Sequence, residues 1–393
     1  MPSLVNGSWT EVRAYVHSLP KRLPRKTLPL AEVGGRILAE DVVARADVPN
    51  MDSSAMDGWA VAGEGPWRIA GSIEIGRPTG VKLSTGQAMI IGTGGSIPLG
   101  ARAILRREHG IENEGTVSLS VDGVMPTVGK HLRASAEEIA KGDIVIKAGQ
   151  RLNPIHLAVA ASCGYDEISV SALPSLHLIV TGNEIDAEGT PAPGRLRDSF
   201  TPQFAGLCES VGADAQGSER VVDDREAVTE ALRDSTADIV VTTGGTADGE
   251  ADHVRAVLEK LRASILLDKI AVQPGHPTLL AKLPGGRFVV ALAGNPLAAI
   301  VGFLGVVHPL VAGMTGAPLT ELVGIELAEE VAGNPRMTRL VPYELRDGWA
   351  FPSQWRAASM LRGLAAADGM LVVEPGLGRR GDRVGSLSLP WKS

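Results

Sequence analysis

The stretch SLHLIVTGNE, residues 175–184, decides the fold of the middle of this chain. A mostly apolar run leads directly into a turn that contains glycine, and the pattern recurs in ADIVVTTGG (237–245) and RFVVALAGNP (287–296). Unbroken apolar runs indicate strands that are buried on both faces. Helical patterns alternate with these strands, at 201–211, 224–235, 250–262 and 297–307. The sequence therefore predicts a parallel sheet with helices on both faces, a doubly wound α/β domain.

The glycine turns that follow the three strands are candidate ligand-binding loops. The carboxyl ends of parallel strands meet at one edge of a sheet, and ligands bind beyond that edge. Glycine lets backbone N–H groups approach a phosphate, and a following helix N-terminus adds its dipole. A single such loop is more often a structural turn, but three at one edge favour a site. The residues concerned are Thr181, Gly182, Gly244, Gly245, Thr246, Gly249, Gly294, Asn295 and Pro296.

Several familiar motifs are missing from the sequence. The phosphate-binding pattern GxxxxGK[ST] does not occur, and Gly92-Thr93-Gly94-Gly95 lacks GxGxxG spacing. These omissions exclude a P-loop and a dinucleotide fingerprint. GxSxG and HExxH are also missing, so neither a serine hydrolase elbow nor a zinc protease helix is indicated.

Carboxylates accompany the glycine loops. Mg²⁺ takes one or two carboxylates together with phosphate oxygens, so acidic side chains beside a phosphate site suggest a bridging cation. For Asp223, Asp224 and Glu250, each at a helix start, an N-cap role is an equally good interpretation. Asp57 lies in the small-residue turn SSAMDG (53–58), which can hold a carboxylate near a ligand or a second chain. The other candidates are Asp52, Glu138, Glu184, Asp248 and Asp252.

Composition narrows the class of protein. The 393 residues carry 38 basic and 45 acidic side chains, a net charge of −7, which argues against a protein that binds nucleic acid. With 47 Gly and 25 Pro but only 6 Trp, 3 Tyr and 5 Phe, a chain that is 44% hydrophobic needs many tight loops in a folded protein. This composition suits a small phosphate-bearing ligand better than one held by stacking.

Cysteine content and the termini suggest a compartment. Cys163 and Cys208 have no metal-ligand spacing, and residues 1–16 lack the features of a signal peptide. The apolar stretch 291–314 is interrupted near both ends, and its unbroken part, 297–307, is too short to span a bilayer. We therefore expect a buried helix there, no membrane association and a cytoplasmic protein.

The regions before and after the α/β pattern have different sequence patterns. Ser8 and Glu11 have capping-box spacing before a helical pattern over 8–23. Short alternating runs separated by Gly and Pro predict a β module up to about residue 128, and a helix is expected at Pro154–Cys163. Short strands return after residue 317, which predicts a small C-terminal β domain.

A longer stretch, ADVPNMDSSAMDGWAV (46–61), resembles the D-x-P-x-x-D-x-S-A-M-D-G-Y-A signature of the MoeA family, the molybdopterin molybdenumtransferases. Further stretches resemble the family in the same order along the chain. They are IIGTGGSIPLGARAILRRE (90–108), TGNE (181–184), VVTTGGTADGEADHV (240–254), IAVQPGHP (270–277) and LAGNPLAA (292–299).

The resemblance implies an elongated chain of four domains. A discontinuous first domain, which contributes to dimerisation, would take 1–45 and 129–171, and an inserted β domain 46–128. A molybdopterin-binding α/β domain would take 172–316, and a C-terminal β barrel 317–393. It further implies a homodimer with the active site between subunits. The activity would be insertion of molybdenum from molybdate into adenylylated molybdopterin, with Mg²⁺ or another divalent cation and release of AMP. Molybdenum cofactor enzymes would then be transfer partners.

Residue by residue, the resemblance assigns catalytic roles to Asp57, Thr93, Glu184 and Asp252. It assigns the cation to Glu138, Glu184, Asp224 (or Asp223) and Asp252. The ligand's phosphate groups would meet Lys269, Gln273, Gly275 and His276 in addition to the glycine loops.

Departures from the family pattern lie where ligand charge should be met. The family's K-P-G-K-P segment reads Gln273-Pro274-Gly275-His276-Pro277, and its G-G-x-S-x-G loop reads GGTADG (244–249). Gln carries no charge, and His carries one only when protonated. Two hypotheses therefore stand: a working molybdenum insertase, or a weak or inactive paralogue that binds molybdopterin as a scaffold. An adenylyl-transferring enzyme and a nucleotide hydrolase have less support.

Overall fold

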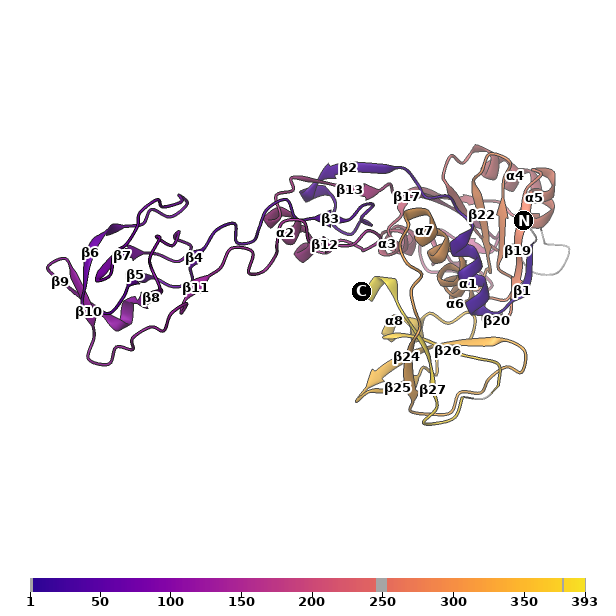
Figure 1. The fold of residues 1–393 in the computed structure, drawn as a ribbon. Coiled ribbons are helices and arrows are strands. Elements are labelled where there is room, and N and C mark those ends of the chain that lie inside the picture. The colour runs from indigo at the N-terminus through magenta and orange to yellow at the C-terminus, as the bar shows by residue number, and fades with distance from the viewer. Residues whose placement is uncertain (1–2, 245–252, 377, 393) are drawn as a thin grey trace.

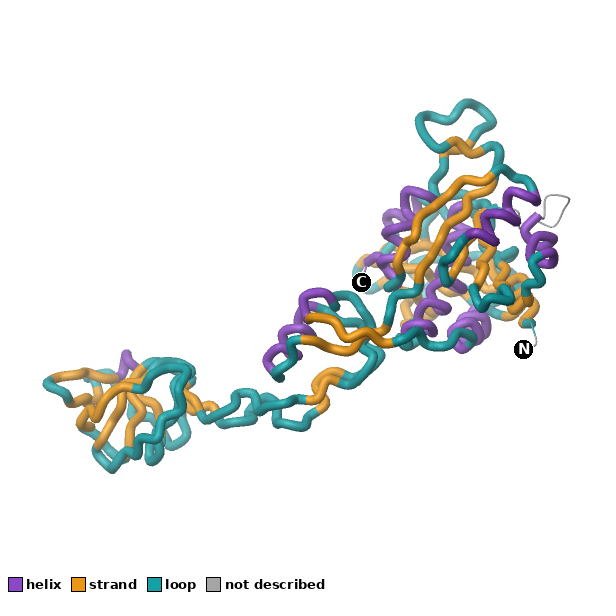
Figure 2. Tube along the Cα trace, turned by 90° about the horizontal axis from the view of Figure 1, so that it is seen from above, coloured by secondary structure: helices purple, strands orange, loops and turns teal. Residues whose placement is uncertain are grey.

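The chain is elongated: the inserted β domain, the first domain and the α/β domain follow one another along its length, and the C-terminal β domain lies beside the α/β domain (Figure 1). A computed structural model describes residues 3–244, 253–376 and 378–392. Figure 1 shows a small β domain at one end, a narrow two-stranded connection, and a larger α/β domain with the C-terminal β domain at the other end. The view from above in Figure 2 shows the same separation. The expected multidomain architecture is confirmed.

The α/β domain is built on a seven-stranded sheet. β14, β18 and β22 are parallel neighbours, with β17 parallel at one edge. β21 runs antiparallel to both β22 and β19, so the expectation of a wholly parallel sheet is wrong for this edge, where a short turn joins β21 to β22. The order is β1 (Leu4–Gly7), β19 (Ser264–Ile270), β21 (Leu279–Lys282), β22 (Phe288–Leu292), β18 (Ile239–Thr243), β14 (Ser175–Thr181) and β17 (Asp214–Val221).

Helices cover both faces of this sheet, as predicted. One face packs with α4 and α5 through Val228, Leu232 and Val257. The other packs with α3, α6 and α7 around Phe204, Leu297 and Leu310. The helices are α3 (Thr201–Val211), α4 (Arg225–Asp234), α5 (His253–Lys260), α6 (Pro296–Gly302) and α7 (His308–Thr315).

The apolar helix that begins at Pro296 is longer than expected. A π-helical segment, Phe303–Val307, joins α6 to α7, so the helix continues through Pro309 to Thr315. Proline has no backbone donor for the preceding turn, and the wider π-helical turn lies just before Pro309. These 20 residues are long and apolar enough to cross a membrane, but 94% of their most apolar window is buried inside the protein. The length argument was wrong, whereas the expected buried helix is confirmed.

The N-terminus belongs to the α/β domain. β1 pairs in parallel with β19, and α1 (Trp9–Ser18) begins at Ser8 with the predicted capping box. Trp9 is fully buried in the main core, and a Cβ on Gly305 would lie 2.6 Å from its ring. The boundary that places all of 1–45 in the first domain therefore does not describe β1 and α1, because the apolar stripe of α1 is buried against α7.

The first domain is formed by segments on either side of the insertion. Its antiparallel pairs join β2 with β13 and β3 with β12, and Val33, Leu38 and Ile146 lie in a separate core. Asn153 caps the predicted helix. The elements are β2 (Arg25–Pro29), η1 (Leu30–Glu32), β3 (Val42–Val43), β12 (Ile144–Ile146), α2 (Pro154–Ser162) and β13 (Glu167–Ser171).

The inserted domain is all β, as predicted. Its six-stranded sheet has the order β8-β5-β7-β6-β10-β9 around Trp59 and Trp67, and β4 pairs with β11 where the chain enters and leaves. The elements are β4 (Ser53–Ser54), β5 (Gly58–Ala62), β6 (Trp67–Ser72), β7 (Gln87–Ile91), β8 (Ala103–Arg106), η2 (Arg107–His109), β9 (Gly110–Asn113), β10 (Thr116–Leu119) and β11 (Leu132–Arg133).

The C-terminal domain is a closed barrel, because β24 pairs with both β25 and β26. β20, from the α/β domain, adds to it by pairing in parallel with β24. The elements are β20 (Val272–Gln273), β23 (Val323–Leu327), β24 (Thr338–Arg346), β25 (Trp349–Pro352), α8 (Arg362–Ala366), β26 (Gly369–Val373), β27 (Arg383–Ser388) and η4 (Pro390–Lys392).

Candidate ligand site

A cavity of about 480 Å³ opens where β14, β18 and β22 end. The three predicted loops do meet here, because these strands are parallel neighbours. Residues that the sequence assigned to the site contribute much of the lining. They are Thr181, Glu184, Gly244, Gly294, Asn295 and Pro296.

Glycine is required where these loops approach one another. Gly244 has φ of +89°, and a Cβ there would lie 2.9 Å from Thr181 Oγ1. Gly182 has φ of +136°, and a Cβ there would lie 3.1 Å from both carboxylate oxygens of Glu184. Side chains rarely adopt these backbone conformations. Gly182 therefore gives the Glu184 carboxylate room to lie close to the backbone at the end of β14.

Two polar side chains of the lining lack an expected hydrogen bond within the part of the chain that the structure describes. Thr243 is 2% exposed, yet its Oγ1 has no hydrogen-bond partner among the described residues. Asn295 occupies the N-cap position of α6, but its side chain makes no capping hydrogen bond. Unsatisfied buried hydroxyls are costly, and Asn at an N-cap normally bonds to its helix. Both groups are therefore suited to a ligand.

The first amides of α6 are occupied from another domain. Ala358, in the loop between β25 and α8, accepts hydrogen bonds from Leu297 N at 2.9 Å and Ala298 N at 3.2 Å. These amides are not open to a ligand, in contrast to the expectation that the N-terminus of this helix contributes them. Ser359 of the same loop reaches the cavity lining, so the barrel closes one side of the site.

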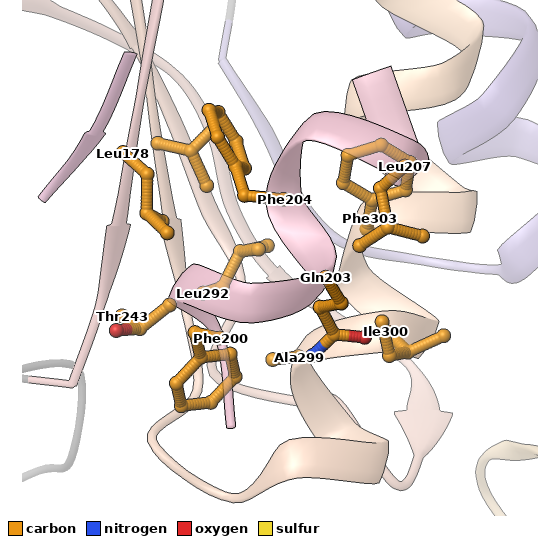
Figure 3. Close-up of a pocket in the computed structure, with 11 residues that line it drawn as sticks. Leu178, Phe200, Gln203, Phe204, Leu207, Thr243, Leu292, Ala299, Ile300 and Phe303 are labelled. Atoms are coloured by element: carbon orange, nitrogen blue, oxygen red, sulfur yellow. The ribbon is translucent and has the colours of Figure 1, made fainter. Parts of the chain in front are cut away.

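A smaller apolar cavity of about 20 Å³ lies behind the site. Figure 3 shows Phe200, at the N-cap position of α3, with Gln203 and Phe204 of α3 and with Leu292 and Thr243 of the strands around it. Phe200 and Thr243 line both cavities. At this size the inner cavity has room for about one water molecule. It is therefore a packing defect beneath the larger cavity rather than a second ligand site.

Two site residues were missed by sequence reasoning. Asp198 is 4% exposed and accepts hydrogen bonds from Phe200 N, Thr201 N and Thr201 Oγ1 at 2.7–3.1 Å. It thus fixes the start of α3. Arg197 precedes it on β16 (Leu196–Arg197), which pairs with β15 (Ile185–Asp186). The signal was an acidic residue shortly before the predicted helix at 201–211, a capping pattern.

The predicted phosphate-binding segment 269–276 does not line this cavity in the described part of the chain. Gln273 Oε1 accepts a hydrogen bond from Asn334 Nδ2 at 3.0 Å, at the junction with the barrel. His276 Nδ1 lies 2.6 Å from the carbonyl of Ile270, within its own loop. Gly275 packs against α6, where its Cβ would lie 3.1 Å from Ala298 O. Lys269 lies on β19 with φ of +63°.

Asp57 and Thr93 form a second polar centre, in the inserted domain. Asp57 Oδ1 accepts hydrogen bonds from Thr93 N at 2.7 Å and Thr93 Oγ1 at 3.0 Å. The backbone and then the side-chain bond from Thr93 lower the pKa of Asp57, and Arg107 adds to this. Adjacent Gly58 is required, since a Cβ there would lie 2.0 Å from Leu105 O. The carboxylate is thus held ionised and exposed at the surface.

Within one chain, these two centres lie in separate domains at opposite ends of the molecule (Figure 1). The other predicted carboxylates are also dispersed. Glu138 is exposed, and its backbone pairs with Val48 in the connection to the insertion. Asp224 caps α4 by accepting from Glu226 N and Ala227 N. Among the described residues, no three His, Cys, Asp or Glu side chains are grouped to hold a metal ion.

Part of one glycine loop lies outside the described residues. The predictions for Gly245, Thr246, Gly249 and Asp252, and the departures at Ala247 and Asp248, fall there.

The fold and the cavity define a class of protein: a multidomain chain whose α/β domain has a cavity at the ends of its parallel strands. Residues 8–164 match the MoeA N-terminal region (domain I and II), and residues 177–313 match the probable molybdopterin binding domain. A molybdopterin molybdenumtransferase from Staphylococcus aureus is 30% identical over 382 residues, covering 92% of this chain and 90% of the relative. The chain belongs to the MoeA family of molybdopterin molybdenumtransferases.

Other relatives agree. A molybdopterin molybdenumtransferase from Staphylococcus epidermidis is 32% identical over 91% of this chain and 88% of its own length. A crystal structure of a molybdopterin biosynthesis MoeA protein from Pyrococcus horikoshii is similar with a TM-score of 0.78 at 25% identity, covering 98% of this chain and 99% of that one. A second structure of a MoeA protein from this organism has a TM-score of 0.81 at 22% identity, covering 98% and 100%.

Proposed function

We propose that this protein is a molybdenum insertase, which transfers molybdenum from molybdate into adenylylated molybdopterin and releases AMP. Its membership of a family of molybdopterin molybdenumtransferases supports the activity. The observation that carries the proposal is the cavity, where the glycine loops of three parallel strands meet around Glu184, Thr243 and Asn295. The backbone of such loops can approach phosphate groups closely.

Glu184 is the proposed acidic group on the α/β side of the site. Mg²⁺ is typically bound by one or two carboxylates plus phosphate oxygens. Glu184, held over Gly182, fits one such position, and Asp252, outside the described residues, is the second that the family pattern implies. Because the described residues lack a ready-made cluster of three ligands, we expect the cation to arrive with the phosphate groups. A bound cation would neutralise phosphate charge as AMP leaves.

Asp57 and Thr93 are the proposed groups on the other side. The low pKa of Asp57 keeps it ionised at neutral pH, so it can accept hydrogen bonds from ligand or from metal-bound water. Since the insertion lies far from the cavity within one chain, we propose that the site is completed in a homodimer, by the insertion of the partner subunit. Symmetric two-fold assembly then makes two equal sites.

The proposed function also includes the expected cation, substrates, compartment and partners. Mg²⁺ or another divalent cation is required, and molybdopterin and molybdate are substrates. The protein is cytoplasmic and passes the finished cofactor to molybdenum enzymes, without binding nucleic acid or a membrane.

Purified protein with adenylylated molybdopterin and Mg²⁺ tests the activity. Release of AMP should depend on molybdate, and Glu184→Gln should reduce it by at least about 100-fold, as loss of a transition-state contact does. Glu188→Gln, a nearby exposed acid outside the cavity lining, is the matched control. A folded dimer that binds the substrate but releases no AMP would instead support the alternative, a molybdopterin-binding scaffold, which the Gln273 and His276 departures motivate.

A further inference from the structure

The cavity has little positive charge for a ligand that carries phosphate groups. Its lining includes two carboxylates, Glu184 and Asp198. Among the described residues of the lining, Arg197 is the one cationic side chain. Charge-assisted hydrogen bonds to phosphate are roughly twice as strong as neutral ones, so this arginine has a large influence on an anionic ligand.

One nitrogen of the Arg197 guanidinium is fixed by hydrogen bonds to the backbone, and the other two are open among the described residues. Nη1 donates to the carbonyl oxygens of Asp186 and Asp198, each at 3.2 Å. Nε and Nη2 have no hydrogen-bond partner among the described residues, and the side chain is exposed at the cavity. A guanidinium fork presents parallel donors that match phosphate oxygens, and a fixed fork loses less entropy on binding.

Neighbouring carboxylates do not neutralise this arginine by direct pairing. Asp186 makes its ion pair with Arg195, at 2.6 Å, and this bond is the main cause of its lowered pKa. Asp198 directs its carboxylate to the backbone and hydroxyl at the start of α3. Among the described residues neither acid pairs directly with Arg197, although the charge of Arg197 also helps to lower the pKa of Asp186. The Nε and Nη2 donors of Arg197 are therefore open to an anionic ligand.

Positive charge at position 273 would be poorly placed by comparison. Gln273 is the register partner of Arg339 on β24, and its side chain bonds to Asn334. Burial and then the charge of Arg356 already lower the pKa of Arg339. A lysine here would add a third cation to the junction with the barrel.

We infer that Arg197 supplies the fixed positive charge that receives the phosphate oxygens of the ligand in this chain. The inference rests on the proposed function, which names adenylylated molybdopterin as the ligand. The phosphate-binding role is thereby assigned to a residue of the β15–β16 arm, residues 185–197, rather than to the 273–277 loop.

Equilibrium binding of adenylylated molybdopterin by titration calorimetry tests this assignment. Arg197→Gln should raise Kd by about 10- to 100-fold, the range expected for a charge-assisted bond, and binding should become less sensitive to salt. Arg197→Lys should recover part of the loss, since it keeps the charge without the fork. The matched control is Arg233→Gln, an exposed arginine of the same domain on α4, and should leave Kd unchanged.

The outcomes separate this inference from the proposed function. If wild type binds and Arg197→Gln binds within about twofold of it, the assignment is wrong while the insertase proposal stands. If binding depends on Arg197 but AMP is not released, the insertase proposal fails and the assignment stands. If both variants are folded and equally weak, with the salt dependence of wild type, Arg197 acts only by holding its arm and the inference is overturned. No binding by wild type overturns both.

Discussion

The Asp57–Thr93 pair and the strand-end cavity reach preorganisation by opposite routes. The pair is made by two short turns of one domain, with two hydrogen bonds that converge on one carboxylate oxygen. The cavity needs three strands, the start of α3, the β15–β16 arm and a loop of the barrel. The pair is a surface feature that any partner can reach, whereas the cavity is a concave site whose contributors are distant in sequence.

This difference teaches where each half of the proposed site is vulnerable. A single substitution can remove the pair without disturbing its domain, because both side chains are exposed. The cavity is more dependent on long-range packing, since its walls belong to the core shared by the α/β domain and the barrel. In the homodimer that we propose, the two halves would be joined by assembly of two subunits rather than by the folding of one chain.

Mixing two inactive variants is the most direct test of whether the Asp57 centre of one subunit completes the cavity of the other. Asp57→Asn and Glu184→Gln should each reduce AMP release by at least about 100-fold. After subunit exchange in an equal mixture, activity should return to about a quarter of wild type, because about half of the dimers are mixed and each has one intact site. Asp122→Asn, an exposed acid of the insertion, is the control for the first variant. No recovery despite verified exchange would show that the two halves do not meet.

The two regions should also respond differently to acid. Burial and then Arg13 and Arg151 lower the pKa of His308, on α7, from 6.5 to about 4. Because the unfolded chain takes up a proton between these values and the folded chain does not, stability is complete above pH 6.5 and falls towards pH 4. We expect the α/β region to lose about 2 kcal/mol between pH 6.5 and 5. Hydrogen exchange of α7 against the insertion should measure it.

His308→Leu provides the comparison for that acid response. The free energy of unfolding of this variant should vary less between pH 6.5 and 5 than that of wild type. Equal pH dependence of the two proteins would show that His308 is not the responsible group.

The pair itself can be weakened by Thr93→Val, which removes the hydroxyl donor and retains the backbone donor. The pKa of Asp57 should rise towards its ordinary value, as followed by carboxyl NMR, because one of its stabilising bonds is lost. AMP release should fall by about tenfold, because the Asp57 carboxylate would keep only one of the two hydrogen bonds that orient it. Thr93→Ser should preserve both properties. An unchanged pKa in the valine variant would contradict this interpretation.

The smallest effect is expected from Gln273→Lys. The new charge would lie at the barrel junction beside Arg339 rather than at the cavity, so Kd for adenylylated molybdopterin should change by less than about threefold. Stability should fall by about 1 kcal/mol through loss of the bond to Asn334. Asn334→Ala removes the same bond without adding charge. A tenfold gain in affinity would show that the 273–277 loop does meet the ligand.

Local patterns in the sequence predicted the elements well. The apolar runs at 175–180, 237–242 and 287–293 became β14, β18 and β22, and the spacing of Ser8 and Glu11 gave the capping box of α1. These features depend on neighbours within a few residues. The glycine turns could be assigned to one edge because parallel strands leave no alternative for their carboxyl ends.

The features that could not be predicted from the sequence depend on packing between residues far apart in the chain. Nothing local shows that residues 4–18 cross to the α/β sheet, or that the amides of α6 bond to Ala358 about 60 residues later. Arg197 was missed because a single arginine on a two-residue strand has no sequence pattern. Its role is indicated by the carbonyl oxygens and the cavity that surround it. His276 is predicted to face an anion, and the sequence does not show that its Nδ1 lies 2.6 Å from the carbonyl oxygen of Ile270 in the same loop.

The hydrogen bonds from Leu297 and Ala298 to Ala358 bear on the modularity of the molecule. They make the C-terminal barrel a wall of the cavity rather than an exchangeable appendage. A chain shortened after residue 316 would lose Ser359 from the lining and leave two backbone donors in the first turn of α6 without their acceptor. If this α/β domain were combined with a different C-terminal domain, the new domain would have to supply an acceptor in place of the Ala358 carbonyl to keep this side of the cavity intact.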